Sequence, residues 1–418
     1  MESVVVRGGK VLEGEVSVSG AKNSALPVLF STLLAEGTHT LHNVPRLKDV
    51  ESTCQLLELL GCKTQREGTT LTIQVPTLSN FEAHYDVVRK MRASILCLGP
   101  ILAKYGQAQV SLPGGCAIGT RPINLHLEAL KTLGAEITVE KGYVHASAKK
   151  LRGDTVLFET ATVGGTENIL MAAVFAEGKT IIENAAKEPE VVDLANYLNK
   201  MGAQIKGAGS SIITVEGVES LHPSEHTIIP DRIEAGTLLI AGALTGGKVK
   251  VTDCIPEHLD ALISKMRESG FQISTEESSI TVHPCTVWKG VDITTTPHPG
   301  FATDLQAQFM VLMTQAKGTS VITESIFENR FMHVQELSRL GADITPKTRV
   351  AVVRGRKGGL EGAPVMATDL RASASLVLAG LVAHGATKVN RIYHLDRGYE
   401  NLEAKLRSLG ADVERLHQ

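Results

Sequence analysis

Stretches with apolar side chains at helical spacing alternate along the chain with shorter strand-like runs. The helical patterns end at two series of glycines. The first lies within Leu-Gly-Ala or a near variant and comprises Gly61, Gly134, Gly202, Gly270, Gly341 and Gly410, and the second comprises Gly37, Gly106, Gly178, Gly246, Gly318 and Gly385. Glycine commonly ends helices, and a strand-like run follows each glycine of the second series. The pattern therefore predicts six repeats of about seventy residues, each reading helix, strand, helix and then strands.

The sixth repeat lacks its last strands, because the chain stops soon after Val413. The missing strands are expected at the other terminus, where the run of residues 5–8 with Leu-Glu-Gly at 12–14 resembles residues 352–355 with Leu-Glu-Gly at 360–362. Three repeats per half predict one domain of residues 20–229. They also predict a second, discontinuous domain of residues 1–19 plus 230–418, with linkers near Gly20 and Pro230.

One loop breaks the repeat. From the second-series glycine to the next helix start there are 10 to 12 residues in five repeats but 15 in the second, where residues 111–122 include three glycines and two prolines. Cys116 lies in this excursion, before a helix expected from Asn124, with Arg121 nearby; a helix N-terminus and a cation both favour a thiolate. A small residue filling a tight turn is the alternative. The insertion favours a catalytic lid.

Basic residues recur where the repeated helices are expected to start. The twelve equivalent positions are Asn23, Lys48, Arg92, Arg121, Gly164, Pro189, Arg232, Glu257, Asp304, Glu328, Arg371 and Arg397. Six are Lys or Arg, whereas composition predicts about one. Cations at helix N-termini oppose the macrodipole, so the pattern predicts convergence on an anionic ligand. The alternative is a set of ion pairs, and this is favoured for Arg232 beside Asp231.

Composition narrows the class of protein. The chain is 43% hydrophobic and 21% charged with a net charge of −3, typical of a globular protein rather than one that binds a polyanion or a membrane surface. The six cysteines show no CxxC pair, and the N-terminus has no signal-peptide core, so a soluble cytoplasmic protein is expected. Cys54, Cys62 and Cys97 are expected in the core.

Several common motifs are absent or fail. Gly242 to Lys248 fits GxxxxGK, but Val249 replaces the hydroxyl residue and the run joins a helix to a strand, the reverse of a P-loop. There is no GxGxxG, HExxH or GxSxG, and the histidines show no ligand spacing. We expect no metal, no nucleotide cofactor, no nucleic acid and no obligate protein partner. Small molecules are the expected partners.

At this point the chain resembles a known family. The residues that carry the resemblance are Lys22-Asn23, residues 113–116 with 119–122, Phe327 to Met332, Ala367 to Ser373 and Asp396 to Glu400. Together they resemble the UDP-N-acetylglucosamine 1-carboxyvinyltransferases, the enolpyruvyl transferases that open peptidoglycan synthesis. The resemblance implies an α/β fold, a two-domain inside-out barrel of six βαβαββ units with its active site in the interdomain cleft. It also implies transfer of an enolpyruvyl group from phosphoenolpyruvate to the sugar 3-hydroxyl.

The resemblance also implies roles for residues. Cys116 matches the general acid, and Asp304 matches the group that takes the proton of the hydroxyl. The phosphate contacts match Lys22, Arg121 and Arg397, and the carboxylate contacts match Arg371 and Arg397. The UDP-sugar pocket matches Arg92, Arg121, Pro122, Ile123, Asn124, Leu125, Val163, Gly164, Asp304 and Ile326. Asn23, beside Lys22, is also expected to bind substrate. One departure is Thr160, where many members of the family have lysine.

Two rival interpretations remain at this stage. A shikimate-type enolpyruvyl transferase shares the chemistry but lacks this cysteine loop and needs no UDP pocket, so residues 113–122 argue against it. A non-catalytic repeat protein that binds a nucleotide sugar would show no turnover at all. Phosphate release from phosphoenolpyruvate distinguishes these two interpretations from a UDP-N-acetylglucosamine 1-carboxyvinyltransferase.

Overall fold

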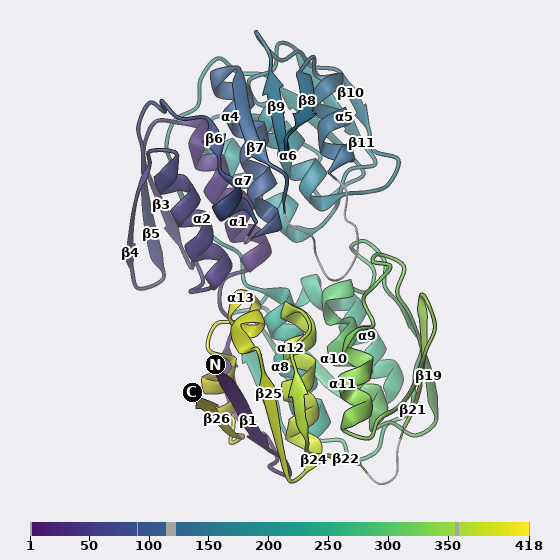
Figure 1. The fold of residues 1–418 in the computed structure, drawn as a ribbon. Coiled ribbons are helices and arrows are strands. Elements are labelled where there is room, and N and C mark those ends of the chain that lie inside the picture. The colour runs from purple at the N-terminus through teal and green to yellow at the C-terminus, as the bar shows by residue number, and fades with distance from the viewer. Residues whose placement is uncertain (1, 90, 114–122, 356–358, 418) are drawn as a thin grey trace. The chain divides into compact units, whose positions relative to one another are not determined.

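The computed structural model describes residues 2–89, 91–113, 123–355 and 359–417 (Figure 1). These residues form two compact units. The continuous unit comprises residues 20–113 and 123–229, and the discontinuous unit comprises residues 2–19 and 230–417, with the gaps given above. Cys116, Arg121 and Pro122 lie outside the described residues.

Three four-stranded sheets are formed by the described residues of the continuous unit. The first repeat contains α1 (Lys22–Ser31), η1 (Thr32–Leu34), β3 (Gly37–His42), α2 (Lys48–Leu59), β4 (Lys63–Glu67) and β5 (Thr70–Val75). The second contains β6 (Glu82–Ala83), α3 (Tyr85–Val88), η2 (Arg92–Cys97), α4 (Leu98–Tyr105), β7 (Gln107–Ser111), α5 (Asn124–Thr132), β8 (Glu136–Glu140) and β9 (Tyr143–Ser147). The third contains β10 (Thr155–Leu157), α6 (Val163–Ala173), β11 (Lys179–Glu183), α7 (Pro189–Lys200), β12 (Gln204–Lys206) and β13 (Ile212–Glu216), and β14 (Glu225–Thr227) follows it.

The discontinuous unit begins with β1 (Ser3–Arg7) and β2 (Gly14–Ser17). Its fourth repeat contains α8 (Arg232–Thr245), β15 (Val249–Thr252), η3 (Pro256–Leu259), α9 (Asp260–Ser269), β16 (Ile273–Glu276) and β17 (Ser279–Val282). The fifth contains β18 (Ile293–Thr294), η4 (Thr303–Leu305), α10 (Gln306–Thr314), β19 (Thr319–Thr323), α11 (His333–Arg339), β20 (Asp343–Pro346), β21 (Val350–Arg354) and β22 (Leu360–Glu361). The sixth contains β23 (Pro364–Met366), α12 (Leu370–Val382), β24 (Ala383–His384), β25 (Ala386–Asn390), η5 (Ile392–His394), α13 (Leu395–Gly398), α14 (Leu402–Ser408) and β26 (Asp412–Leu416).

Strand pairing confirms the predicted βαβαββ unit. In the third repeat, β10 runs parallel to β11, and β13 is antiparallel to both β11 and β12, so the spatial order is β10-β11-β13-β12. The second and fifth repeats have the same arrangement in β6-β7-β9-β8 and β18-β19-β21-β20. A parallel pair needs a crossover connection, which the first helix of each repeat supplies.

Strands from the chain termini complete the sixth repeat. β1 lies between β25 and β26 and is antiparallel to both, the place that β21 takes in the fifth repeat. This is the pairing that the likeness of residues 5–8 to 352–355 predicts. Two further pairings are not evident from the sequence pattern: β2 pairs in parallel with β15, and β14 pairs in parallel with β3. In the chain, β2 is followed by α1 of the continuous unit, and β14 is followed by α8 of the discontinuous unit. Each strand thus lies in one unit and leads directly into the other.

Helices of each unit lie between its sheets (Figure 1). The first helix of a repeat is apolar on nearly every side, as in α8, where all residues from Ile233 to Leu244 are buried. The second helix is amphipathic, as in α7. A helix that is apolar all round is a buried one, so the sequence itself assigns the first helices to the core. In the part of the chain that the structure describes, each helix is too short or too polar to cross a bilayer.

All twelve glycines that mark the predicted helix ends have positive φ, from 72° at Gly106 to 120° at Gly37. At Gly270, for example, φ is 116° and its N–H bonds back to the carbonyl of Arg267. An L side chain is strained in this region, whereas glycine is not. The periodic glycines are therefore required by the backbone of the helix ends.

Gly134 offers a test of this constraint, because its φ is 91° and a Cβ atom there would meet nothing within 4 Å. Gly134→Ala should lower the free energy of unfolding by about 1 kcal/mol through backbone strain alone. Gly134→Asn is the matched variant, since asparagine tolerates the left-handed region, and should cost less. Urea unfolding measures both. An alanine variant as stable as the asparagine variant would contradict the argument.

Two buried histidines predict how stability depends on pH. Burial, with a further contribution from Arg92, lowers the pKa of His126 to about 4, and burial likewise lowers that of His333 to about 4. Unfolded histidine titrates near 6.5. Between these values the unfolded chain binds protons that the folded chain does not, so each histidine should remove about 1 kcal/mol per pH unit as pH falls from 6.5 towards 4. Above 6.5 the contribution is constant.

The measurement is the urea midpoint of wild type, His126→Gln and His333→Gln at pH 7 and pH 5. Each variant should lose less stability than wild type between the two pH values. Equal losses in all three proteins would show that neither histidine is buried in its neutral form.

Candidate functional site

The predicted site residues that the structure describes are divided between the two units. The continuous unit carries Lys22, Asn23, Arg92, Ile123, Asn124, Leu125, Val163 and Gly164, and the discontinuous unit carries Asp304, Ile326, Arg371 and Arg397. Most lie at the beginning of a helix or just before one.

Asp304 lies in the short turn η4 before α10, and its carboxylate contacts two guanidinium groups. Arg330 Nη2 is 2.8 Å from Oδ1, and Arg371 Nε is 3.2 Å from Oδ2. Both arginine side chains are buried, whereas the Asp304 side chain is 24% exposed. The negative charge of Asp304 is thus held between two guanidinium groups, and its exposed edge is open to the hydroxyl of a ligand.

Arg371 is a buried cation in the first turn of α12. Its Nη1 donates to the carbonyl of Gly398 over 3.1 Å, and its guanidinium carbon lies 5.1 Å from the centre of the Tyr399 ring. Burial lowers the pKa of Arg371, but Tyr399, Asp304 and Asp231 raise it above the usual arginine value. Nη2 is buried and has no hydrogen-bond partner among the described residues. An anion is the natural partner for such a donor.

A buried glutamate that the sequence analysis missed connects Asp304 with Ile326. Glu324 Oε1 accepts from the backbone N–H of Ile326 at 3.0 Å and of Phe327 at 3.1 Å. Its Oε2 accepts from the Thr303 hydroxyl at 2.9 Å, and Arg330 Nη1 donates to the same hydroxyl oxygen at 2.8 Å. The loop of Ile326 and the turn of Asp304 are therefore held by one carboxylate.

Acidic caps offset the basic residues at two of the helix starts. Asp231 accepts from the N–H groups of Ile233 and Glu234 at the start of α8, just before Arg232. Asp369 accepts from the N–H groups of Arg371 and Ala372 at the start of α12. An N-cap carboxylate stabilises a helix by roughly 1 kcal/mol. The basic residues thus oppose the macrodipole less than the sequence pattern alone indicates.

Nine of the predicted helix starts lie within one residue of the first residue of a helix or helical turn. α2, η2, α7 and α8 begin at Lys48, Arg92, Pro189 and Arg232 themselves, and the other five are each the second residue of their element: Asn23, Gly164, Glu257, Asp304 and Arg371. Arg397 is the third residue of α13. Glu328 is wrong, because α11 begins only at His333 after a non-helical turn. Arg121 lies outside the described residues, and α5 begins at Asn124. The second helix of the fifth repeat therefore begins five residues later than the spacing of the repeat predicts.

In the continuous unit, Lys22 pairs with a second residue that the sequence analysis missed. Lys22 Nζ lies 3.2 Å from Asp49 Oδ2, and both side chains are more than nine-tenths buried. Lys22 begins α1 and Asp49 follows the first residue of α2, so the pair joins the starts of two helices. The expected convergence of helix N-termini is present at this point of the unit.

Three helix starts that carry other predicted residues of this unit meet around His126 of α5. Its Nδ1 lies 3.1 Å from the Asn168 amide of α6, and Arg92 contributes to the low pKa of the imidazole. A Cβ atom on Gly164 would lie 3.1 Å from the His126 ring, so glycine allows α6 to approach α5 closely. The starts of η2, α5 and α6 therefore lie together.

The expected core cysteines are unsuited to chemistry. Burial raises the pKa of Cys54 to about 11 and those of Cys62 and Cys97 to about 12. In the described ranges, no group of three or more His, Cys, Asp or Glu residues is placed to hold a metal ion.

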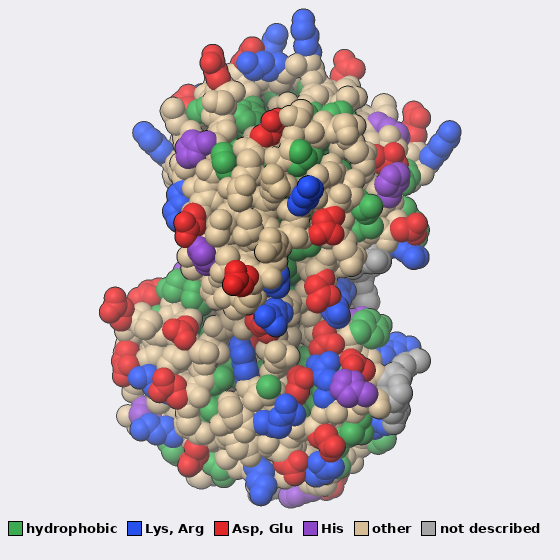
Figure 2. Space-filling model, turned by 90° about the vertical axis from the view of Figure 1, so that its left-hand side faces the viewer, with side chains coloured by type: hydrophobic (Ala, Val, Ile, Leu, Met, Phe, Trp, Pro, Cys, Tyr) green, Lys and Arg blue, Asp and Glu red, His purple; other side chains and the backbone are tan. Residues whose placement is uncertain are grey.

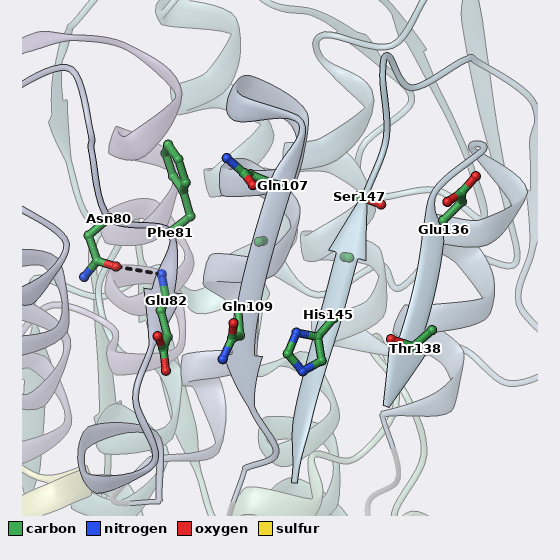
Figure 3. A pocket seen from close by; sticks show the side chains of 11 residues that line it. Asn80, Phe81, Glu82, Gln107, Gln109, Glu136, Thr138, His145 and Ser147 are labelled. Atoms are coloured by element: carbon green, nitrogen blue, oxygen red, sulfur yellow. Dashed lines mark hydrogen bonds between the residues drawn. The ribbon is translucent and has the colours of Figure 1, made fainter. Parts of the chain in front are cut away.

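A cavity of about 430 Å³ in the continuous unit is lined by none of these residues. It opens on the face of the β6-β7-β9-β8 sheet that is turned away from the helices (Figure 3). Polar side chains line it, among them Glu82, Gln107, Gln109, Thr138 and His145. Because it contains no predicted site residue, it is distinct from the candidate site.

The surface seen in Figure 2 carries basic and acidic side chains interspersed with one another. A single broad basic face, which nucleic-acid binding would favour, is not present on that side of the described residues.

The known proteins that this chain resembles in sequence are enolpyruvyl transferases. Residues 6–406 match the family model for EPSP synthase (3-phosphoshikimate 1-carboxyvinyltransferase). UDP-N-acetylglucosamine 1-carboxyvinyltransferase of Bdellovibrio bacteriovorus is 68% identical over 413 residues, covering 99% of this chain and 100% of the relative. The protein of that name from Myxococcus xanthus is 58% identical over 418 residues, covering 99% of each chain.

Solved structures agree with the fold. The enolpyruvyl transferase NikO from Streptomyces tendae matches with a TM-score of 0.89 at 26% identity, over 99% of this chain and 98% of that one. EPSP synthase from Acinetobacter baumannii matches with a TM-score of 0.75 at 18% identity over the whole of both chains, which supports the fold alone. The chain therefore belongs to the enolpyruvyl transferase family, in the branch of the UDP-N-acetylglucosamine 1-carboxyvinyltransferases.

Proposed function

We propose that this chain transfers the enolpyruvyl group of phosphoenolpyruvate to the 3-hydroxyl of UDP-N-acetylglucosamine and releases inorganic phosphate. The names of relatives that share up to 68% identity over nearly the whole chain support this reaction. The observation on this chain that carries the proposal is Asp304, a partly exposed carboxylate bound to two buried arginines. A base beside an anion site is what addition of a hydroxyl to an anionic substrate requires.

In the proposed chemistry, the oxygen of the sugar 3-hydroxyl bonds to C2 of phosphoenolpyruvate, and Asp304 takes the proton of that hydroxyl. The Cys116 thiol, acting as general acid, gives a proton to C3 and completes a tetrahedral adduct. Loss of a proton from C3 and cleavage of the bond between C2 and the phosphate oxygen then restore the double bond. The products are the enolpyruvyl ether and phosphate.

We assign the anionic groups of phosphoenolpyruvate to the basic residues. Lys22, Arg121 and Arg397 would contact its phosphate, and Arg371 and Arg397 its carboxylate. The buried Nη2 of Arg371, which lacks a hydrogen-bond partner among the described residues, supports this assignment. Guanidinium groups bind carboxylates with two parallel hydrogen bonds, which also fixes orientation.

The UDP-sugar would be bound by a wider set of residues. We assign to it Asn23, Arg92, Arg121, Pro122, Ile123, Asn124, Leu125, Val163, Gly164, Asp304 and Ile326. The grouping of Arg92, the start of α5 and Gly164 around His126 supports this part of the proposal. We place the reaction at the first committed step of peptidoglycan synthesis, in the cytoplasm.

Phosphate release from phosphoenolpyruvate tests the reaction. Wild type should release phosphate with UDP-N-acetylglucosamine, but not without an acceptor or with shikimate 3-phosphate. Cys116→Ala should lose most of this activity, because the general acid is absent. Phosphate release with shikimate 3-phosphate would show that the chain is a shikimate-type enolpyruvyl transferase. Absence of phosphate release with both acceptors would leave only a binding role.

Arg371→Lys tests the carboxylate contact. Lysine keeps the charge but cannot bond Asp304, Gly398 and a ligand in one plane, so kcat/KM for phosphoenolpyruvate should fall about 100-fold. KM for the UDP-sugar should change much less. Arg354 of β21 forms an exposed pair with Asp343 of β20, so Arg354→Lys is the matched control and should behave as wild type. Equal kinetics of the two variants would exclude Arg371 from the site.

A further inference from the structure

Arg397 lies in α13, a helical turn of only four residues. So short a turn has little stability of its own, because nucleation is the costly step of helix formation. Two non-glycine residues with positive φ flank this segment, Arg391 at 58° and Asn401 at 49°. Backbone of this kind persists only where the surroundings hold it. Contacts made by the neighbours of Arg397 therefore help to fix the backbone that carries it.

One such contact comes from the last strand of the chain. Arg415 of β26 binds Asp396, the residue before Arg397, with both terminal nitrogens: Nη2 to Oδ1 at 2.6 Å and Nη1 to Oδ2 at 3.1 Å. Its Nε donates to Glu403 of α14 at 2.7 Å. Two parallel bonds between guanidinium and carboxylate fix the relative orientation of the groups.

Burial distinguishes this pair from an ordinary surface ion pair. The Arg415 and Asp396 side chains are 19% and 21% exposed, and that of Glu403 is 9% exposed. Hydrogen bonds to Asp396 and Glu403 raise the pKa of Arg415 above its usual range, against the effect of burial. Exposed pairs contribute little because solvent screens them, whereas this one is largely shielded.

The other end of the turn is held by the candidate site itself. Arg371 Nη1 donates to the carbonyl of Gly398, the residue after Arg397. The turn is thus fixed on one side by Arg371 and on the other by Arg415.

We infer that Arg415 is a positioning residue that holds Arg397 for phosphoenolpyruvate by fixing Asp396. The inference rests on the proposed function, since it takes the role of Arg397 from there. Arg415 itself contacts no substrate in this account. Its loss should weaken phosphoenolpyruvate binding and leave the UDP-sugar pocket unchanged.

The chain supplies a matched control on the same pair of strands. Arg7 of β1 pairs with Asp412 and Glu414 of β26, at 3.1 and 3.3 Å, but these side chains are all 44% or more exposed. Arg7→Gln removes the same charge beside the same strand without touching Asp396.

The experiment compares steady-state kinetics of wild type, Arg415→Gln, Asp396→Asn, their double variant and Arg7→Gln. Arg415→Gln and Asp396→Asn should each raise KM for phosphoenolpyruvate about tenfold, with KM for UDP-N-acetylglucosamine within about twofold of wild type. The double variant should be no worse than Arg415→Gln, because Arg415→Gln already removes the contact with Asp396. Arg415→Lys should be intermediate, and Arg7→Gln should match wild type.

Amide exchange of residues 392–400 gives a readout independent of catalysis, and should be faster in Arg415→Gln than in wild type or Arg7→Gln. A fall in kcat with unchanged KM would indicate a merely structural role and overturn the inference. So would additive effects in the double variant, or unchanged exchange. If wild type does not use phosphoenolpyruvate, the proposed function is wrong, and so is the role of Arg415 that rests on it. An active wild type with normal Arg415→Gln kinetics would remove only the inference.

Discussion

The ionic contact between Asp304 and Arg371 is the constraint on which the candidate site depends. Arg371 is almost completely buried, and a buried guanidinium is very costly unless a carboxylate and further acceptors compensate it. Asp304 supplies the charge, and the carbonyl of Gly398 supplies a further acceptor. Three segments far apart in the sequence must therefore stay together for the core of this unit to remain stable.

The same contact prepares the site for chemistry. Its members come from the starts of repeated helices, and the repeat directs equivalent helix starts to one place in the unit. Asp231 and Asp369 cap two of these helices, so basic side chains can occupy helix N-termini without leaving the backbone N–H groups unsatisfied. Arg330 and Glu324 then hold the Asp304 turn and the Ile326 loop, which makes the site a preorganised one.

Much of this architecture is predictable from the sequence because its determinants are local. Glycines such as Gly270 mark helix ends through a backbone requirement that no other residue meets as well, and their spacing reveals the repeat. The pairing of β1 within the sixth repeat is readable because residues 5–8 resemble residues 352–355. Asp304 and Arg371 are found by the same counting.

The missed features depend on tertiary contacts that leave no local pattern. Asp49 follows a predicted basic helix start, but nothing in the sequence says that Lys22 is its partner. Glu324 reads as the end of a strand, and only the fold brings Thr303 to it. Glu328 fails because an irregular turn precedes α11, where the spacing of the other repeats does not apply. The pairing of β2 with β15 and of β14 with β3 likewise joins strands far apart in the chain and has no local sequence signal.

The central claim is that buried Arg371 and ionised Asp304 form an anion site with a base beside it. A crystal structure of the Cys116→Ala variant soaked with phosphoenolpyruvate and UDP-N-acetylglucosamine tests it most directly, because this variant should turn the substrates over only slowly. The account predicts a carboxylate within hydrogen-bond distance of Arg371 Nη2, with the sugar 3-hydroxyl next to the exposed edge of Asp304. Ligands bound elsewhere, with Nη2 still contacting no substrate, would contradict it.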